Sequence, residues 1–234
     1  MLGIIVEIAL SIALLWIFCK KPITVLGIKP SLHRLKVFLF GMLVMALLCT
    51  FNLWAQTYFK QTNYVLNPDY GFMDALNGIY WTIKAAMFEE LIFRGAILYI
   101  LMRKLGWLWG CLISAAAFGV YHWFSYNMFD RGLIPMAYVF LMTGAAGWMF
   151  AYTFYKTKSI YTPLGLHFGW IVMSIVLFSA GPLGNSLFVL QGEEVEMGGW
   201  PQLFFFLFQT VMVPGGICWY FARRYKPERL EFDS

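Results

Sequence analysis

Seven apolar stretches, each near or above the roughly 20 residues that a helix needs to cross a bilayer, constrain the fold of this 234-residue chain more than any other feature. They lie at residues 2–19, 37–56, 74–102, 106–125, 133–155, 160–180 and 201–222. Hydrophobic residues make up 61% of the chain and charged residues 12%, which is more apolar surface than a soluble domain of this length can bury. The sequence therefore predicts an all-α, polytopic membrane bundle, a single integral-membrane domain over residues 1–234.

Lysines and arginines gather in alternate links between these segments. Four regions hold 13 of the 17: the first, third and fifth links and the C-terminal tail. Because cytoplasmic links are enriched in Lys and Arg, we expect the N-terminus outside and the C-terminus in the cytoplasm. The net charge of +5 then reflects membrane topology, and no nucleic-acid partner is expected. These basic residues are Lys20, Lys21, Lys29, Arg34, Lys36, Arg103, Lys104, Lys156, Lys158, Arg223, Arg224, Lys226 and Arg229.

Three parts of the chain qualify this topology. The 74–102 segment is long for one span, and a break near Lys84 would give eight segments. The links 57–73 and 181–200 contain aromatic residues, Gly and Pro, and are expected to lie in the membrane interface as short amphipathic pieces.

Few ionisable groups lie deep in the apolar segments, and such groups are functional-site hypotheses by default. Glu89, Glu90 and Arg94 occur in the third segment, His122 in the fourth and His167 in the sixth. The chain has three histidines, so two of them belong to this small set. These five residues are the candidate site.

Helix geometry separates the two glutamates. Glu90 and Arg94 are four residues apart, the spacing of an ion pair along one helix face. Glu89 points about 100° away from Glu90, so it is expected to meet a group on another helix, and His122 is the natural partner. The small residues of 114–117, together with Gly144 and Gly147, favour close approach of the helices.

Several functions fit a buried carboxylate, two imidazoles and a paired second carboxylate. In a hydrolase, Glu89 and His122 would activate a water while His167 helps to hold the developing oxyanion. A proton- or ion-coupled transporter and interhelical hydrogen bonds that only fix packing are the alternatives, and Pro214-Gly-Gly in the last segment resembles a helix break of the transporter kind. Glu89, His122 and His167 could also hold zinc, although the adjacent Arg94 argues against a metal.

Three motifs in this chain resemble those of a known family. They are Glu89-Glu90-x-x-x-Arg94, Phe118-x-x-x-His122, and His167 within Gly165-Leu-His-Phe-Gly-Trp170. In this order and spacing they resemble the signatures of the CPBP (Abi) family of intramembrane proteases, which includes the CAAX prenyl endopeptidases of the Rce1 type. The resemblance covers about residues 74–180.

The resemblance implies a glutamic-type membrane endopeptidase without a cofactor, acting on a membrane-tethered peptide or protein. It implies that Glu89 and His122 activate water, that His167 is catalytic, and that Glu90, Arg94 and Phe118 support the site. Compact length and short links suit a bacterial cytoplasmic membrane. The third signature of the family usually ends in an Asn that shares oxyanion stabilisation, and this chain has Ile171 there. Three expectations follow: His167 holds the oxyanion alone, or Ser174 or Asn127 substitutes for the Asn, or the chain is an inactive relative that acts as a binding or immunity protein.

Overall fold

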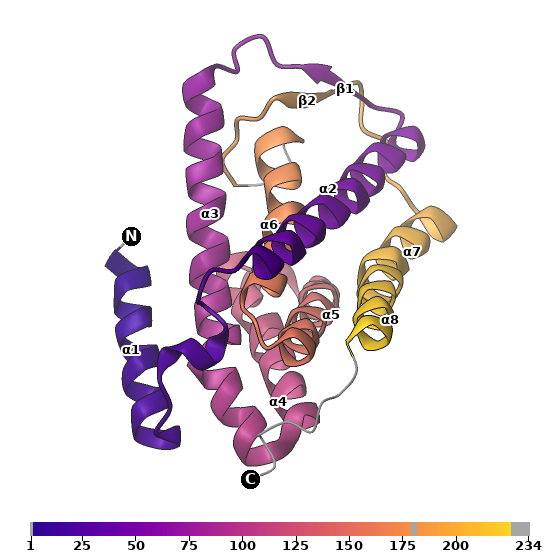
Figure 1. Ribbon diagram of the computed structural model, residues 1–234. Helices are drawn as coiled ribbons and strands as arrows, with labels where there is room; N and C mark the ends of the chain where they lie inside the picture. Colours follow the sequence, from indigo (N-terminus) through magenta and orange to yellow (C-terminus); the bar gives the residue numbers. More distant parts are fainter. Residues whose placement is uncertain (1, 179–181, 226–234) are drawn as a thin grey trace.

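The computed structural model describes residues 2–178 and 182–225, which are mostly helical, as the apolar segments predict (Figure 1). The α-helices are α1 (Leu2–Cys19), α2 (Leu32–Lys60), α3 (Phe72–Arg94), α4 (Ala96–Ser125), α5 (Leu133–Thr157), α6 (Tyr161–Ile171), α7 (Gly199–Leu207) and α8 (Val213–Arg224). Two π-helical segments, η3 (Val172–Leu177) and η4 (Phe208–Met212), extend α6 and join α7 to α8. Short 3-10 turns, η1 (Ile23–Leu26) and η2 (Phe129–Arg131), lie in two of the links.

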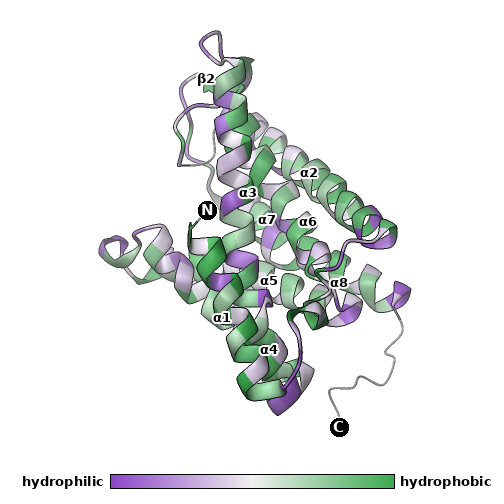
Figure 2. Cartoon of the chain, turned by 60° about the vertical axis from the view of Figure 1, so that its left-hand side comes forward, coloured by the Kyte–Doolittle hydropathy of each residue, from purple (hydrophilic) through white to green (hydrophobic). Residues whose placement is uncertain are grey.

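Four helical segments of the described chain are long and apolar enough to cross a membrane. They are Leu2–Cys19, Leu32–Lys60, Leu133–Thr157 and the joined Gly199–Arg224, and Tyr161–Leu177 is a shorter apolar helix. Figure 2 shows apolar residues along the helices and hydrophilic ones mainly where helices end and in the links. The predicted helical membrane architecture is confirmed at this level, and seven crossings stay a prediction. Lys226, Arg229 and the last two residues of the 160–180 segment lie outside the described residues.

The long third segment does break, but the position expected from the sequence is wrong. Helix α3 continues through Lys84 and ends at Arg94, because the backbone departs from helical geometry at Gly95. A Cβ atom at Gly95 would lie 2.1 Å from the Leu91 carbonyl oxygen, so this break requires glycine. The chain then runs on in helix α4 in a new direction.

Helix α4 is itself folded back at Gly106, whose φ of 82° is outside helical geometry. A Cβ atom at Gly110 would lie 3.1 Å from the backbone nitrogen of Met102, so the two limbs touch. The predicted boundary between the third and fourth segments is therefore present as a tight turn inside α4 (Figure 1).

The two aromatic links contain a short pair of strands that the all-α prediction did not include, and their place in the membrane interface stays a prediction. Strand β1 (Asn63–Leu66) pairs antiparallel with β2 (Phe188–Gln191), with Val65 opposite Val189. Short runs of aromatic and β-branched residues favour such pairing. We call the β1–β2 pair the ribbon; residue 181 of the second link lies outside the described residues.

The opposite end of the molecule collects the links predicted to be cytoplasmic, and we call it the basic end. Its contacts are Arg103 Nη1 to the Cys19 carbonyl (3.4 Å), the Ile160 N–H to the Leu26 carbonyl (3.0 Å) and the Tyr225 ring beside His33 (6.5 Å between centroids). The ribbon joins links of the other predicted set. The first, third and fifth links thus lie together with Tyr225, while the full alternation of ends and the side of the membrane that each end faces stay predictions.

Glycines bring helices α2 and α6 into backbone contact. A Cβ atom at Gly165 would lie 2.4 Å from the Phe38 carbonyl oxygen, and one at Gly169 would lie 2.2 Å from that of Met42. His167 is about 200° around the helix from Gly165, so it points away from α2. This glycine seam therefore fixes the direction in which His167 faces.

Candidate active site

Helix α3 supplies the ion pair that the i,i+4 spacing predicts. Arg94 Nη1 donates to Glu90 Oε1 at 3.3 Å, and both side chains are fully buried. A buried charge is costly unless it is paired and hydrogen-bonded. This pair is therefore neutral as a unit inside the helical bundle.

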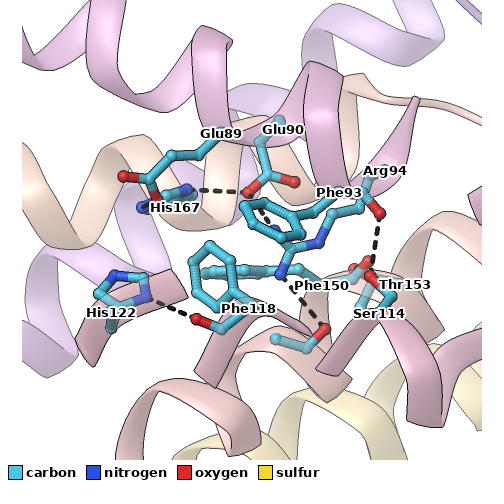
Figure 3. A network of polar contacts seen from close by, with 11 residues as sticks. Glu89, Glu90, Phe93, Arg94, Ser114, Phe118, His122, Phe150, Thr153 and His167 are labelled. Carbon is cyan, nitrogen blue, oxygen red and sulfur yellow. Dashed lines mark hydrogen bonds and ion pairs between the residues drawn. The ribbon is translucent and has the colours of Figure 1, made fainter. Parts of the chain in front are cut away.

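Arg94 also contacts groups on helices α4 and α5. Its Nη2 atom donates to the Gly147 carbonyl of α5 at 3.3 Å. Its guanidinium carbon lies 4.2 Å from the ring centroid of Phe118 and 5.0 Å from that of Phe150, at cation–π distance (Figure 3). The ring of Phe118 covers one face of the Arg94 guanidinium, which is consistent with the supporting role that the resemblance implies for Phe118.

The close contact predicted between α4 and α5 occurs at Gly147. A Cβ atom there would lie 3.1 Å from Phe118 Cβ and 3.2 Å from Ala115 Cα. Ser114 of the same small run donates to the Phe93 carbonyl at 2.9 Å, which ties α4 to α3. Gly144 is less critical, since a Cβ atom would meet only the Ala115 carbonyl oxygen at 3.6 Å.

His167 lies between the two glutamates (Figure 3). Its Nδ1 atom is 2.8 Å from Glu90 Oε1, and its Nε2 atom is 3.7 Å from Glu89 Oε2. Because a carboxylate only accepts hydrogen bonds, Nδ1 carries a proton and donates it to Glu90. Glu90 therefore fixes the orientation of the His167 ring.

The imidazole within ion-pair distance of Glu89 is that of His167, which corrects the expectation that His122 is its direct partner. No ion pair or hydrogen bond joins Glu89 to His122 in the described part of the chain. The sequence allowed either ring, and the α2–α6 glycine seam turns His167 toward α3. Glu89 Oε2 is buried and makes no hydrogen bond to any described residue, so it is a free acceptor.

His122 is fixed by its own helix. Its Nδ1 atom lies 2.8 Å from the Phe118 carbonyl, which can only accept, so Nδ1 carries the proton and the neutral ring has its lone pair on Nε2. The ring packs edge-on against Phe118, with 4.5 Å between centroids. A histidine held in this tautomer can accept a proton at Nε2.

His122 and His167 line the same cavity, which has a volume of about 120 Å³. Ile171 lines it too, one turn beyond His167, so the position where the family has Asn faces both histidines. Neither expected substitute is among the lining residues. Ser174 instead donates to the Ile171 carbonyl at 3.4 Å, and Asn127 lies in the turn after α4 with φ 49°.

Three polar residues that line this cavity were missed by the sequence reasoning: Tyr126, Thr143 and Gln209. Gln209 comes from η4. The available signal was Pro214-Gly-Gly, because a helix cannot satisfy all its backbone groups around a proline. The helix break suggested by that motif is not present: Gly199–Arg224 continues as one helix, which widens into π-helical geometry at η4 directly before Pro214.

The set of possible zinc ligands, Glu89, His122 and His167, does not form a metal-binding group. Within residues 2–178 and 182–225, no three His, Cys, Asp or Glu side chains converge in a way that could hold a metal ion. The described geometry instead provides hydrogen-bonded rings beside a free carboxylate oxygen.

Comparison with known proteins gives one match. Neither a curated protein nor a solved structure matches the chain. Residues 71–173, somewhat less than half of the chain, match the family described as type II CAAX prenyl endopeptidase Rce1-like. The match covers nearly the same stretch as the resemblance at 74–180, and it includes the five residues of the candidate site together with Phe118. Over this segment the chain is similar to the Rce1-like family of type II CAAX prenyl endopeptidases, and its apolar helices are those of an integral membrane protein.

Proposed function

We propose that this protein is an intramembrane endopeptidase that hydrolyses a peptide bond of a membrane-tethered peptide or protein with an activated water. One observation carries the proposal: a buried carboxylate oxygen of Glu89, without a hydrogen bond to any described residue, lies 3.7 Å from the oriented ring of His167, on a segment that matches a protease family. We further propose that it acts in a bacterial cytoplasmic membrane and needs no metal.

The first step would be activation of water. Glu89 Oε2 and the lone pair on His122 Nε2 are two acceptors that can orient one water and take its proton as its oxygen attacks the carbonyl carbon. The proton then passes to the leaving amine when the C–N bond breaks. No covalent intermediate with the enzyme is needed.

His167 would act on the carbonyl oxygen or on Glu89. Glu90 and Arg94 would act through His167, because the Glu90 carboxylate fixes the ring and Arg94 balances its charge. These two residues are positioning residues, since both are fully buried and both act through the ring of His167. Electrostatic preorganisation of this kind supplies a large part of catalysis in many hydrolases.

The test is cleavage by purified protein in liposomes. The probes are a single-span peptide carrying a fluorophore and a quencher, and a farnesylated peptide ending in Cys-a-a-X, after the substrates in the family's name. We expect Glu89→Gln and His122→Ala to lower kcat at least about 100-fold, the usual size of a general-base contribution. Glu193→Gln, an exposed carboxylate in the link before α7, is the matched control and should cleave normally.

Normal cleavage by both site variants would disprove the mechanism. Ile171 favours a second candidate, an inactive relative that binds a membrane partner, because an apolar side chain stands where the family has an amide. That candidate predicts that the parent cleaves neither probe and that Glu89→Ala preserves its phenotype in cells.

A further inference from the structure

Gln209 is the side-chain amide that faces the two histidines. It lines the 120 Å³ cavity together with His122, His167 and Ile171, and it comes from η4, outside the segment that matches the family. The remaining lining is mostly apolar, with Met45, Phe118 and Phe150 among it. An amide in such surroundings is a strong hydrogen-bonding group, because water does not compete with it.

One N–H of the amide has no partner among the residues that the structure describes. Gln209 Nε2 donates to the Phe205 carbonyl, one turn earlier, at 3.2 Å. A glutamine amide has two N–H bonds, so the second can donate to a ligand in the cavity. The π-helical geometry of η4 sets this register, and such widened turns occur frequently at functional sites.

Other polar groups of the cavity are less available. The Thr143 hydroxyl donates to the Val139 carbonyl at 2.7 Å, which occupies its single proton. His167 is engaged by Glu90 at Nδ1 and faces Glu89 at Nε2. Tyr126 remains as a competing donor; it is 49% exposed and lies at the end of α4.

Gln209 also lines a second cavity of about 460 Å³, which is more polar and contains the Lys60–Glu194 ion pair. The same side chain therefore stands between this cavity and the one with the histidines. An extended peptide that passes from one cavity into the other would present its backbone carbonyls to this amide.

We propose that Gln209 donates a hydrogen bond to the carbonyl oxygen of the scissile peptide bond, and so supplies the oxyanion contact that Ile171 cannot make. This inference rests on the proposed peptidase function and deepens it. The contact strengthens as the carbonyl carbon becomes tetrahedral and negative charge develops on its oxygen. No bond to Gln209 forms or breaks.

The experiment measures kcat and KM with the probe peptide that the parent cleaves. Gln209→Ala should lower kcat about 100- to 1,000-fold, the loss seen when one oxyanion donor is removed, with little change in KM. Gln202→Ala is the matched control, since Gln202 lines the larger cavity only and is exposed. Adding Ile171→Asn to Gln209→Ala should restore most of the lost kcat by returning an amide to the cavity.

Thermal unfolding in detergent checks that each variant is folded. Cleavage by Gln209→Ala at the parent's rate overturns the proposal, and loss of kcat in Tyr126→Phe instead would assign the contact to the phenol. A folded Gln209→Ala that Ile171→Asn cannot rescue overturns the oxyanion role in favour of a structural one. If the parent cleaves neither probe, or Glu89→Gln cleaves normally, the proposed function fails and this inference falls with it.

Discussion

Glu90 Oε1 is the atom on which the candidate site converges. It accepts a hydrogen bond from Arg94 at 3.3 Å and from His167 at 2.8 Å, so a cation from its own helix and a ring from α6 share one acceptor. Burying an ion pair is often no more stabilising than burying apolar groups of similar size. The pair is therefore better understood as a device that orients His167 than as a source of stability.

Removal of the cation should have a large effect. Arg94→Met leaves Glu90 charged and buried without its ion-pair partner, which typically costs about 3–5 kcal/mol. We expect a clear drop in unfolding temperature in detergent together with loss of cleavage. Lys84→Met, on the same helix and without an ion pair in the described part of the chain, is the control and should stay close to the parent. Equal stability of the two variants would contradict the orienting network.

At the scale of elements, the α2–α6 seam positions a catalytic candidate from the far side of its helix. Gly165 and Gly169 face α2, whereas His167 between them faces the opposite way. Any side chain on the seam would push α6 toward α3 and move the ring relative to both glutamates. The packing of one face of α6 (Tyr161–Ile171, 11 residues) against α2 thus determines where His167 lies on its other face.

The seam makes a specific prediction for one methyl group. In Gly169→Ala the new Cβ atom would lie 2.2 Å from the Met42 carbonyl oxygen, which is a steric clash. Overpacking of this kind lowers stability by about 1–3 kcal/mol. We expect a lower unfolding temperature and reduced cleavage. Gly144→Ala, whose Cβ atom would have ordinary contact at 3.6 Å, should change neither. An unaffected Gly169→Ala would mean that α6 is not held by α2.

Whether an interaction could be predicted from the sequence depends on how far apart its partners are along the chain. The Glu90–Arg94 pair depends on residues four apart, and the close approach at Gly147 depends on small side chains, so both were predictable. The Glu89–His167 approach, the place of the break at Gly95 and the pairing of β1 with β2 depend on contacts between distant segments. Periodicity within a single segment carries no information about such contacts.

At the scale of the whole molecule, two ends can be distinguished: the basic end, and the end that carries the ribbon. Links that are far apart in sequence meet at the basic end through Arg103, Cys19, Ile160 and Leu26. Interactions at the other end involve the ribbon and the Lys60–Glu194 pair at 2.6 Å. Since cytoplasmic links are enriched in Lys and Arg, the basic end should face the cytoplasm.

Orientation can be tested by labelling intact cells with a membrane-impermeant maleimide. In a background without the four native cysteines, Asp130→Cys should be labelled from outside, and Lys158→Cys only after the cells are permeabilised. Both positions are exposed, so reactivity reports the side of the membrane and not burial. The reverse pattern would show that the basic end faces outward.

The ribbon also imposes an order on assembly. Its strands are separated by residues 67–187, and closing so long a loop costs entropy that a two-stranded ribbon alone, marginal in stability, cannot offset. We therefore expect helices α3 to α6, which lie between the strands in sequence, to pack before the strands pair. A molecule whose ribbon has formed would then already hold Glu89, His122 and His167 in place.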